Sequence, residues 1–243
     1  MIETDLFLLK PARVCQELLA QLPEWLSTDE LHIWQAMTHP ERRQEYLVSR
    51  ALLRQLLAER LQQPAASLQF CNGPHGKPRL HNDGWQFNLS HSGSWLVLAL
   101  CPQGPLGVDI ELGKRRHHPL PLARRFYAQS EYEWLCALPA QEQESAFYRL
   151  WSRKEAVLKA HGGGIAAGLE KVRFLPEEGW RLDNRLDDTP YQVEDWPFAS
   201  GWLSLAAAAT PVAFYRLDER LNCHSLNPML LNTLSEGSVP ITC

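Results

Sequence analysis

The sequence predicts an α+β protein built from two halves of similar make-up. Two observations support this prediction: each half contains one long helical pattern with three or four short strand patterns, and helices and strands are grouped instead of alternating strictly. The chain has 243 residues, 45% hydrophobic and 21% charged, so each half can bury a core. A cleft between the halves is the expected ligand site.

The first half begins with a strand pattern at residues 4–9. Residues 28–30 (Thr-Asp-Glu) are typical of a helix start, and residues 41–61 form the longest helical pattern, which ends before Pro64. Turn residues rich in Asn, Gly and Pro then separate several short apolar segments. These segments predict strands at residues 68–71, 85–89, 95–100 and 106–112.

The second half follows a basic loop at residues 114–118 and is bounded by three glycines that end its long helix at residue 161. Its helices are expected at residues 123–127, 130–138 and 143–161, and its strands at residues 172–175, 191–193, 202–207 and 212–216. From residue 222 the sequence lacks periodicity, which predicts a poorly ordered tail. The predicted organisation is therefore 1–105, 106–221 and a tail at 222–243.

Composition excludes several classes of protein. The net charge of −4 argues against nucleic-acid binding. No apolar run is long enough to cross a membrane, and Asp5 and Lys10 interrupt any signal peptide. The six cysteines are scattered without a C-x-x-C pair, which favours reduced thiols. We expect a cytoplasmic protein that binds neither nucleic acid nor a membrane.

Two carboxylates lie on the strand expected at residues 106–112. Because strand residues alternate between faces, Asp109 and Glu111 point the same way. Such carboxylates repel each other unless a cation lies between them, and Mg²⁺ commonly binds one or two carboxylates together with substrate phosphates. A solvated acidic face on an amphipathic strand is the alternative, and for this segment alone it is the commoner case.

A second candidate lies on the helix at residues 143–161. Trp151, Glu155 and Lys159 are four residues apart, so they share one helix face that offers an aromatic ring, a carboxylate and an ammonium group. A surface Glu–Lys pair is the alternative.

Two turns carry groups suited to phosphate. The segment 88–93 (Asn-Leu-Ser-His-Ser-Gly) offers hydroxyls, an imidazole and turn amides, and the segment 76–79 (Gly-Lys-Pro-Arg) offers positive charge with close backbone approach. A polar hairpin turn and an exposed basic turn are the alternatives. Serine nucleophilic catalysis is disfavoured, because the adjacent Ser90 and His91 side chains diverge and no G-x-S-x-G motif is present.

The order GKP, NLSHS, GVDIE and WSRKEAVLK resembles the 4′-phosphopantetheinyl transferase superfamily, in its larger, two-halved surfactin-synthetase-activating (Sfp) type. The resemblance covers residues 42–168. It implies two similar α/β halves in a pseudo-twofold arrangement, with the active site in the cleft between them, and a monomer. It also implies transfer of the 4′-phosphopantetheine group from coenzyme A to a serine of an acidic apo acyl or peptidyl carrier protein, giving the holo carrier and 3′,5′-ADP.

The resemblance further implies the roles of individual residues. Asp109, Glu111 and Glu155 would hold Mg²⁺, Lys159 would contact the phosphate bridge of coenzyme A, and Glu155 is the best candidate for the base. Asp109, Glu155 and Lys159 form the expected catalytic group. The expected coenzyme A contacts in the two turns are Gly76, Lys77, Pro78, Arg79, Ser90, His91, Ser92 and Gly93.

For two basic regions, the sequence leaves open which residues bind a ligand or partner. The family places a basic residue near the first long helix for the 3′-phosphate; Arg43 and Arg50 are the predicted residues, whereas Arg54 has a packing or pairing role as its alternative. Residues 114–118, with Arg124 and Arg125, form a basic patch that could steer an acidic carrier, with a solvated loop as the alternative.

Other functions are compatible with parts of this pattern. Three carboxylates and basic residues also suit a magnesium-dependent phosphodiesterase or nuclease. A coenzyme A or nucleotide-binding module without catalysis is a non-enzymatic alternative, although the three acidic positions and Lys159 are all present. The sequence leaves open whether the carrier serves fatty acid, polyketide or nonribosomal peptide synthesis.

Overall fold

The computed structural model describes residues 3–81, 84–113, 119–208 and 211–234. The strands are β1 Thr4–Leu9, β2 Phe70–Asn72, β3 Pro78–Leu80, β4 Gln86–Ser92, β5 Trp95–Cys101, β6 Leu106–Leu112, β7 Val172–Leu175, β8 Arg181–Asn184, β9 Gln192–Phe198, β10 Gly201–Ala207, β11 Val212–Leu217 and β12 Cys223–Ser225. The helices are α1 Gln16–Leu19, α2 Thr28–Ala36, α3 Pro40–Leu61, α4 Pro119–Phe126, α5 Gln129–Ala137 and α6 Ala140–His161, and the 3-10 helix η7 spans Pro228–Thr233.

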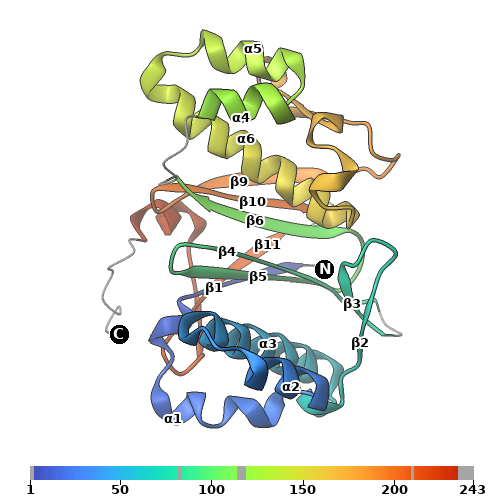
Figure 1. Cartoon of the computed structure of the whole chain (residues 1–243), viewed down its shortest axis with the longest axis vertical. Coiled ribbons are helices and arrows are strands. Elements are labelled where there is room, and N and C mark those ends of the chain that lie inside the picture. The colour runs from blue at the N-terminus through green and yellow to red at the C-terminus, as the bar shows by residue number, and fades with distance from the viewer. Residues whose placement is uncertain (1–2, 82–83, 114–118, 209–210, 235–243) are drawn as a thin grey trace.

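These elements stack as four layers, with helices outside and two sheets between them (Figure 1). The five-stranded sheet has the order β12-β11-β1-β5-β4, and the three-stranded sheet has the order β6-β10-β9. Each half contributes one helix of 22 residues, α3 or α6, to an outer layer. The prediction of two similar halves is confirmed. None of the described helices is long and apolar enough to cross a lipid bilayer.

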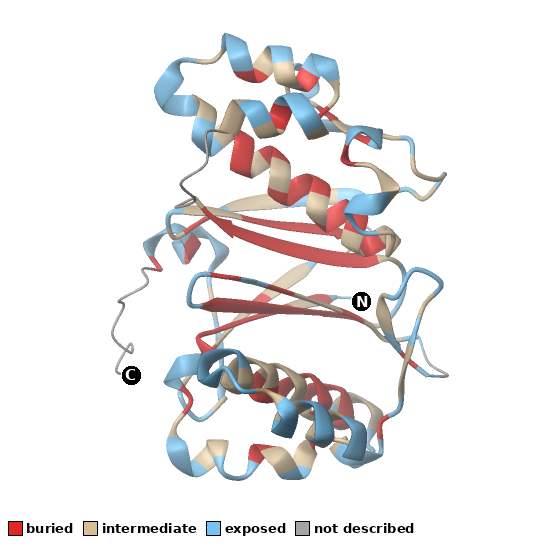
Figure 2. Cartoon of the chain, viewed as in Figure 1, coloured by how far each residue is buried: buried red, intermediate tan, exposed pale blue. Residues whose placement is uncertain are grey.

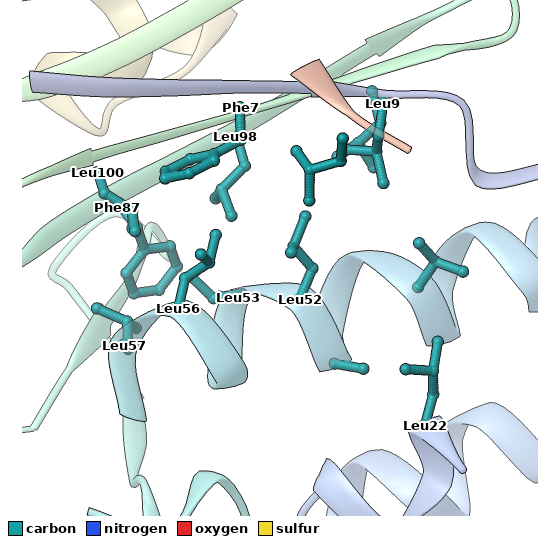
Figure 3. Close-up of a cluster of buried hydrophobic side chains, with 14 of the residues drawn as sticks. Phe7, Leu9, Leu22, Leu52, Leu53, Leu56, Leu57, Phe87, Leu98 and Leu100 are labelled. Atoms are coloured by element: carbon teal, nitrogen blue, oxygen red, sulfur yellow. The ribbon is translucent and has the colours of Figure 1, made fainter. Parts of the chain in front are cut away.

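The first core lies between α3 and the five-stranded sheet. Apolar residues return along α3 at helical spacing, so one face is buried and points at the sheet (Figure 3). Leu53 and Leu57 are fully buried against Phe87 and Leu98. Burying a side chain of this size contributes roughly 1.5–3 kcal/mol, so this layer holds α3 firmly against the sheet.

A second core lies between the two sheets and determines which way β6 faces. Val108 and Ile110 pack there with Leu6 and Leu8 of β1. Figure 2 shows β5 and β6 buried along their length. Because side chains alternate along a strand, Asp109 and Glu111 face away from this core, toward α6.

Gly107 allows β6 and α6 to approach closely. A Cβ atom at this position would lie 2.0 Å from Ala156 O and 2.4 Å from Ala160 N. Both separations are far below van der Waals contact, and both neighbours are backbone atoms of α6. The glycine therefore sets the depth at which the helix rests on the strand.

The substitution Gly107→Ala is expected to lower the free energy of unfolding by an amount at the upper end of roughly 1–3 kcal/mol, because α6 must move. Thermal unfolding followed by circular dichroism measures this change. Gly73→Ala is the matched control, since its Cβ would meet only Lys77 O at 3.4 Å. Equal melting temperatures for the two variants would contradict the packing described.

The C-terminal strands complete the first sheet. β11 pairs in parallel with β1, and β12 pairs with β11. Leu231 and Leu234 are buried in the core between the sheets. The predicted poorly ordered tail is therefore wrong for residues 222–234, because β11 offers a pairing edge and the core accepts two leucines; residues 235–243 lie outside the described ranges.

The predicted division of the chain at residue 105 stays a prediction. It falls between β5 and β6, which belong to different sheets. However, β11 lies in the predicted second half, yet it extends the sheet of the first half, because β1 would otherwise have an open edge on that side. The first sheet therefore includes one pair of strands, β11 and β12, from the C-terminal part of the chain.

Candidate active site

Asp109 and Glu111 lie on the face of β6 that α6 covers. Their exposed fractions are 4% and 6%, so the alternative of a solvated acidic face is wrong. The predicted shared face is confirmed by the packing of Val108 and Ile110 on the other side. Burying an ionised carboxylate is unfavourable unless charge or hydrogen bonds compensate it. The surroundings of these two side chains therefore matter for function.

Lys159 supplies positive charge to this cluster from α6. Its Nζ atom lies 2.6 Å from Asp109 Oδ1 and also donates to Ser90 Oγ at 2.8 Å and to Val108 O at 3.2 Å. An ammonium group has three donors, and these three acceptors match them. The Lys159 side chain is 26% exposed, so solvent still reaches it.

Glu155 lies one helical turn before Lys159 on the same face of α6. Its Oε1 atom is buried and accepts no hydrogen bond from any described residue. Burial, together with the charge of Asp109, raises the pKa of Glu155 to about 7, although the charge of Lys159 acts in the opposite direction. A carboxyl group with this pKa can accept a proton near neutral pH.

Polar side chains of β4 connect the edges of the two sheets. β4 ends the five-stranded sheet, and β6 ends the three-stranded one. Because every second residue of β4 points at β6, its polar side chains accept hydrogen bonds from alternate backbone N–H groups of β6. The bonds are Val108 N to Asn88 Oδ1 at 2.8 Å, Ile110 N to Ser90 Oγ at 3.3 Å and Leu112 N to Ser92 Oγ at 3.1 Å.

This ladder corrects the expectation that residues 90–92 form a turn. They continue β4, and the reversal comes at Gly93, whose φ of 56° lies in the left-handed region that favours glycine. Ser90 and Ser92 are buried, whereas His91 points to the opposite face and is largely exposed. His91 Nε2 lies 3.6 Å from Glu45 Oε1 of α3. Of the predicted contacts in this segment, His91 is therefore the side chain most accessible to a ligand.

The segment 76–79 also has a structural role. Lys77 Nζ donates to Leu106 O at 2.7 Å and to Ala160 O at 3.2 Å, so its ammonium joins β6 and the end of α6. Gly76 has φ 83°, and β3 begins two residues later at Pro78. Arg79 is exposed, and its Nε atom donates to Cys71 Sγ at 3.3 Å. The Lys77 charge therefore points into the protein, while Arg79 remains at the surface.

Burial lowers the pKa of Lys77 to about 8 from its usual 10.5, which links stability to pH. Between these two values the unfolded chain binds more protons than the folded one, so folding becomes more favourable as pH rises. The wild-type protein is expected to gain up to about 3 kcal/mol over Lys77→Met between pH 7.5 and 10.5. Urea unfolding of both proteins across this range measures the gain. If the difference in free energy of unfolding between the wild type and Lys77→Met became smaller as pH rises, the lowered pKa of Lys77 would be contradicted.

The three helical arginines have different surroundings. Arg54 is buried, pairs with Glu30 and donates to Ala65 O at 2.7 Å and Leu68 O at 2.9 Å, so the alternative of a structural role is correct. Arg43 stacks on Trp34, with 4.5 Å between guanidinium carbon and ring centroid. Arg43 lines a cavity of about 410 Å³ among α1, α2 and α3. These helices pack on one face of the five-stranded sheet, and β6 lies on the other side of that sheet (Figure 1).

Arg50 is half-buried on α3, and its guanidinium carbon lies 5.6 Å from the ring centroid of Tyr46. Unlike Arg54, it has no ion pair within the described residues. Of the two arginines predicted to bind the 3′-phosphate, Arg50 is therefore the one whose charge is more available to a ligand. Arg43 lies against Trp34 of α2.

Comparison with known proteins identifies the family. Residues 105–208 match the 4′-phosphopantetheinyl transferase superfamily, and residues 15–103 match the family described as "4′-phosphopantetheinyl transferase, N-terminal". The chain is 34% identical over 194 residues to a putative 4′-phosphopantetheinyl transferase of Synechocystis, slr0495, covering 74% of this chain and 78% of that protein. This chain belongs to the 4′-phosphopantetheinyl transferase superfamily.

Two Bacillus subtilis proteins show the same relationship. The chain is 30% identical over 199 residues to 4′-phosphopantetheinyl transferase ffp, covering 81% of this chain and 88% of that one. It is 30% identical over 176 residues to 4′-phosphopantetheinyl transferase Sfp, covering 71% and 77% respectively. The predicted Sfp-type resemblance is confirmed. The protein is an enzyme of the transferase class, and its family moves phosphopantetheine from coenzyme A to carrier proteins.

The acidic cluster of this phosphopantetheinyl transferase has the donor chemistry that Mg²⁺ prefers. Glu155 Oε1 is a buried carboxylate oxygen without a hydrogen bond from the described residues, and the charge of Asp109 contributes to the raised pKa of Glu155. Within the described ranges, however, no three His, Cys, Asp or Glu side chains are close enough together to hold a metal ion as placed. The metal assignment therefore remains a prediction.

Sequence reasoning missed two groups that shape this phosphopantetheinyl transferase. Asn88 lies in the segment 88–93 that was predicted as a phosphate-binding turn, but its role is to accept a hydrogen bond from β6. The alternation of polar residues at positions 88, 90 and 92 could have indicated this role. Lys154 is fully buried and pairs with Glu131 Oε2 at 2.7 Å. The burial of Lys154 could have been predicted from its spacing, because it shares a helix face with Leu150 and Leu158, which are both apolar.

Proposed function

We propose that the protein transfers the 4′-phosphopantetheine group at the cluster of Asp109, Glu155 and Lys159, with Mg²⁺ held by Asp109, Glu111 and Glu155. The observation that carries this proposal is the 2.6 Å contact between Lys159 Nζ and Asp109 Oδ1 beside Glu155, whose pKa is about 7. A cation, an acidic pair and a proton acceptor are thereby available in one place.

The reaction needs no nucleophile from the enzyme. The carrier serine oxygen attacks the phosphorus of the phosphopantetheine arm, a new O–P bond forms, and the bond to the bridging oxygen breaks. That oxygen leaves with the electron pair as part of 3′,5′-ADP. Glu155 accepts the serine proton, and Lys159 stabilises the charge on the phosphates. Mg²⁺, when bound, supplies further positive charge to the phosphate oxygens.

Coenzyme A is proposed to bind along the first half of the chain. The exposed His91, the turn at Gly93 and Arg50 offer accessible groups for its phosphates, and Gly76 to Arg79 lie near the adenosine side. The hydroxyls of Ser90 and Ser92 and the ammonium of Lys77 have internal hydrogen-bond partners. Any contact that these three make with coenzyme A would have to compete with those bonds.

The carrier is proposed to be acidic and to approach the second half. Arg124 and Arg125 end α4 and give it a basic last turn, while the predicted basic residues 114–118 lie outside the described ranges. Such a surface would steer an acidic partner. A cytoplasmic monomer is proposed as well; five of the six cysteines lie in the described ranges, and all five are free thiols.

Mass spectrometry of candidate apo carriers incubated with enzyme, coenzyme A and Mg²⁺ tests the proposal. A mass gain of one phosphopantetheine on serine, with 3′,5′-ADP released in equal amount, is expected. A carrier whose target serine is replaced by alanine serves as control. Release of 3′,5′-ADP without carrier would indicate a phosphodiesterase instead, and coenzyme A binding with no transfer to any carrier would indicate a binding module.

A further inference from the structure

Among the three ladder bonds between β4 and β6, the one from Ser90 differs from its neighbours. Asn88 and Ser92 each accept one N–H group of β6. Ser90 Oγ also accepts from Ile110 N at 3.3 Å, but in addition it donates to Asp109 Oδ1 at 2.9 Å and accepts from Lys159 Nζ at 2.8 Å. This hydroxyl therefore reaches the cluster that its two neighbours do not contact.

The bonding capacity of the Ser90 hydroxyl is used completely. A serine hydroxyl has one donor and two acceptor lone pairs, and here the donor goes to Asp109 while the lone pairs receive Lys159 and Ile110. The residue is 6% exposed, so water cannot readily replace these partners. Loss of the hydroxyl would leave Lys159 with two acceptors and Asp109 Oδ1 with one donor fewer.

The atoms that Ser90 holds come from separate elements. Asp109 lies on β6, Lys159 lies two residues before the end of α6, and Ser90 lies on β4 in the other sheet. The hydroxyl is thus a contact through which the first half of the chain acts directly on the acidic cluster of the second half. A buried hydroxyl with three hydrogen-bond partners has little freedom to move.

We propose that Ser90 is a positioning residue that fixes Asp109 and Lys159 for their roles, and that it acts through them and not by contact with coenzyme A. The proposal rests on the proposed function in one respect: Asp109 is taken as a metal ligand and Lys159 as a phosphate contact. Partners that orient metal ligands typically change metal affinity or activity by roughly 10–100-fold when removed. The same range is expected here.

Three variants test this role. Ser90→Ala removes the hydroxyl, Ser90→Thr retains it, and Asn88→Ala removes a neighbouring ladder bond of 2.8 Å without touching the cluster. For each variant, electron paramagnetic resonance measures Mn²⁺ affinity with coenzyme A present, calorimetry measures coenzyme A affinity without metal, and thermal unfolding measures stability. None of these readouts requires transfer to a carrier.

Ser90→Ala is expected to weaken Mn²⁺ binding by roughly 10–100-fold. In the absence of metal it is expected to weaken coenzyme A binding by a smaller factor, through the loosened Lys159. Ser90→Thr is expected to restore both affinities. Asn88→Ala should lose stability alone. Unchanged Mn²⁺ affinity in Ser90→Ala, equal losses of Mn²⁺ affinity in Ser90→Ala and Asn88→Ala, or no Mn²⁺ binding by the wild type would each overturn the proposal. A wild type that binds both ligands yet modifies no carrier would reject the proposed function while leaving the comparison of variants valid.

Discussion

Asp109→Ala is expected to lower the rate of phosphopantetheine transfer by at least about 10²–10³-fold, the usual consequence of removing one group that stabilises transition-state charge. Two effects combine here. A proposed metal ligand is lost, and Lys159 loses the carboxylate that its Nζ atom contacts at 2.6 Å. The protein should remain folded, because the buried charge that is removed lies outside the cores around Val108 and Ile110.

The initial rate of mass gain on an apo carrier, measured at several Mg²⁺ concentrations, quantifies this loss. Asp188→Ala is the matched control, since Asp188 is exposed and lies outside the cluster. Thermal unfolding of both variants shows that each is folded. If Asp109→Ala regained wild-type rates on addition of Mg²⁺, Asp109 would not be an essential part of the site.

Lys154→Met is expected to lower the free energy of unfolding by about 3–5 kcal/mol, the usual cost of breaking a buried ion pair. Lys154 Nζ contacts Glu131 Oε2 at 2.7 Å and donates to Leu169 O at 3.0 Å and to Val172 O. One ammonium group therefore links α6 to α5 and to the start of β7. Burial lowers the pKa of Lys154, and the charge of Glu131 works against this shift. Removing the lysine would leave Glu131 buried without its counter-charge.

For a protein of this size, such a loss corresponds to a fall in melting temperature of roughly 6–20 °C. Lys171→Met provides the control, because Lys171 is exposed. The double variant Glu131→Gln with Lys154→Met should recover part of the loss, since it removes the unpaired charge. A melting temperature within error of wild type for Lys154→Met would show that the buried pair contributes nothing.

Local patterns predicted the strand bounds of β1, β6 and β7 and the two long helices well. In β6, the alternation of apolar and acidic residues also predicted correctly that Asp109 and Glu111 share a face. The same alternation could not tell what covers that face. The answer depends on α6, whose close approach at Gly107 brings Glu155 and Lys159 over the strand.

Non-local partners account for most of what sequence reasoning missed. The apolar pattern of β11 predicts a strand but not its parallel pairing with β1 at the opposite end of the chain. Ser90 and Lys77 belong to residue types that favour turns and phosphate sites, yet in the fold their polar atoms meet acceptors and donors from the other half. Composition and spacing along one segment do not contain that information.

A crystal structure of the enzyme with coenzyme A and Mn²⁺, in which anomalous scattering locates the ion, would show whether the acidic cluster is the metal site. We expect the ion in contact with carboxylate oxygens of Asp109 and Glu155 and with the pyrophosphate, and Lys159 Nζ within hydrogen-bond distance of a phosphate oxygen. An ion bound away from both carboxylates, or a pyrophosphate beyond the reach of Lys159, would contradict it.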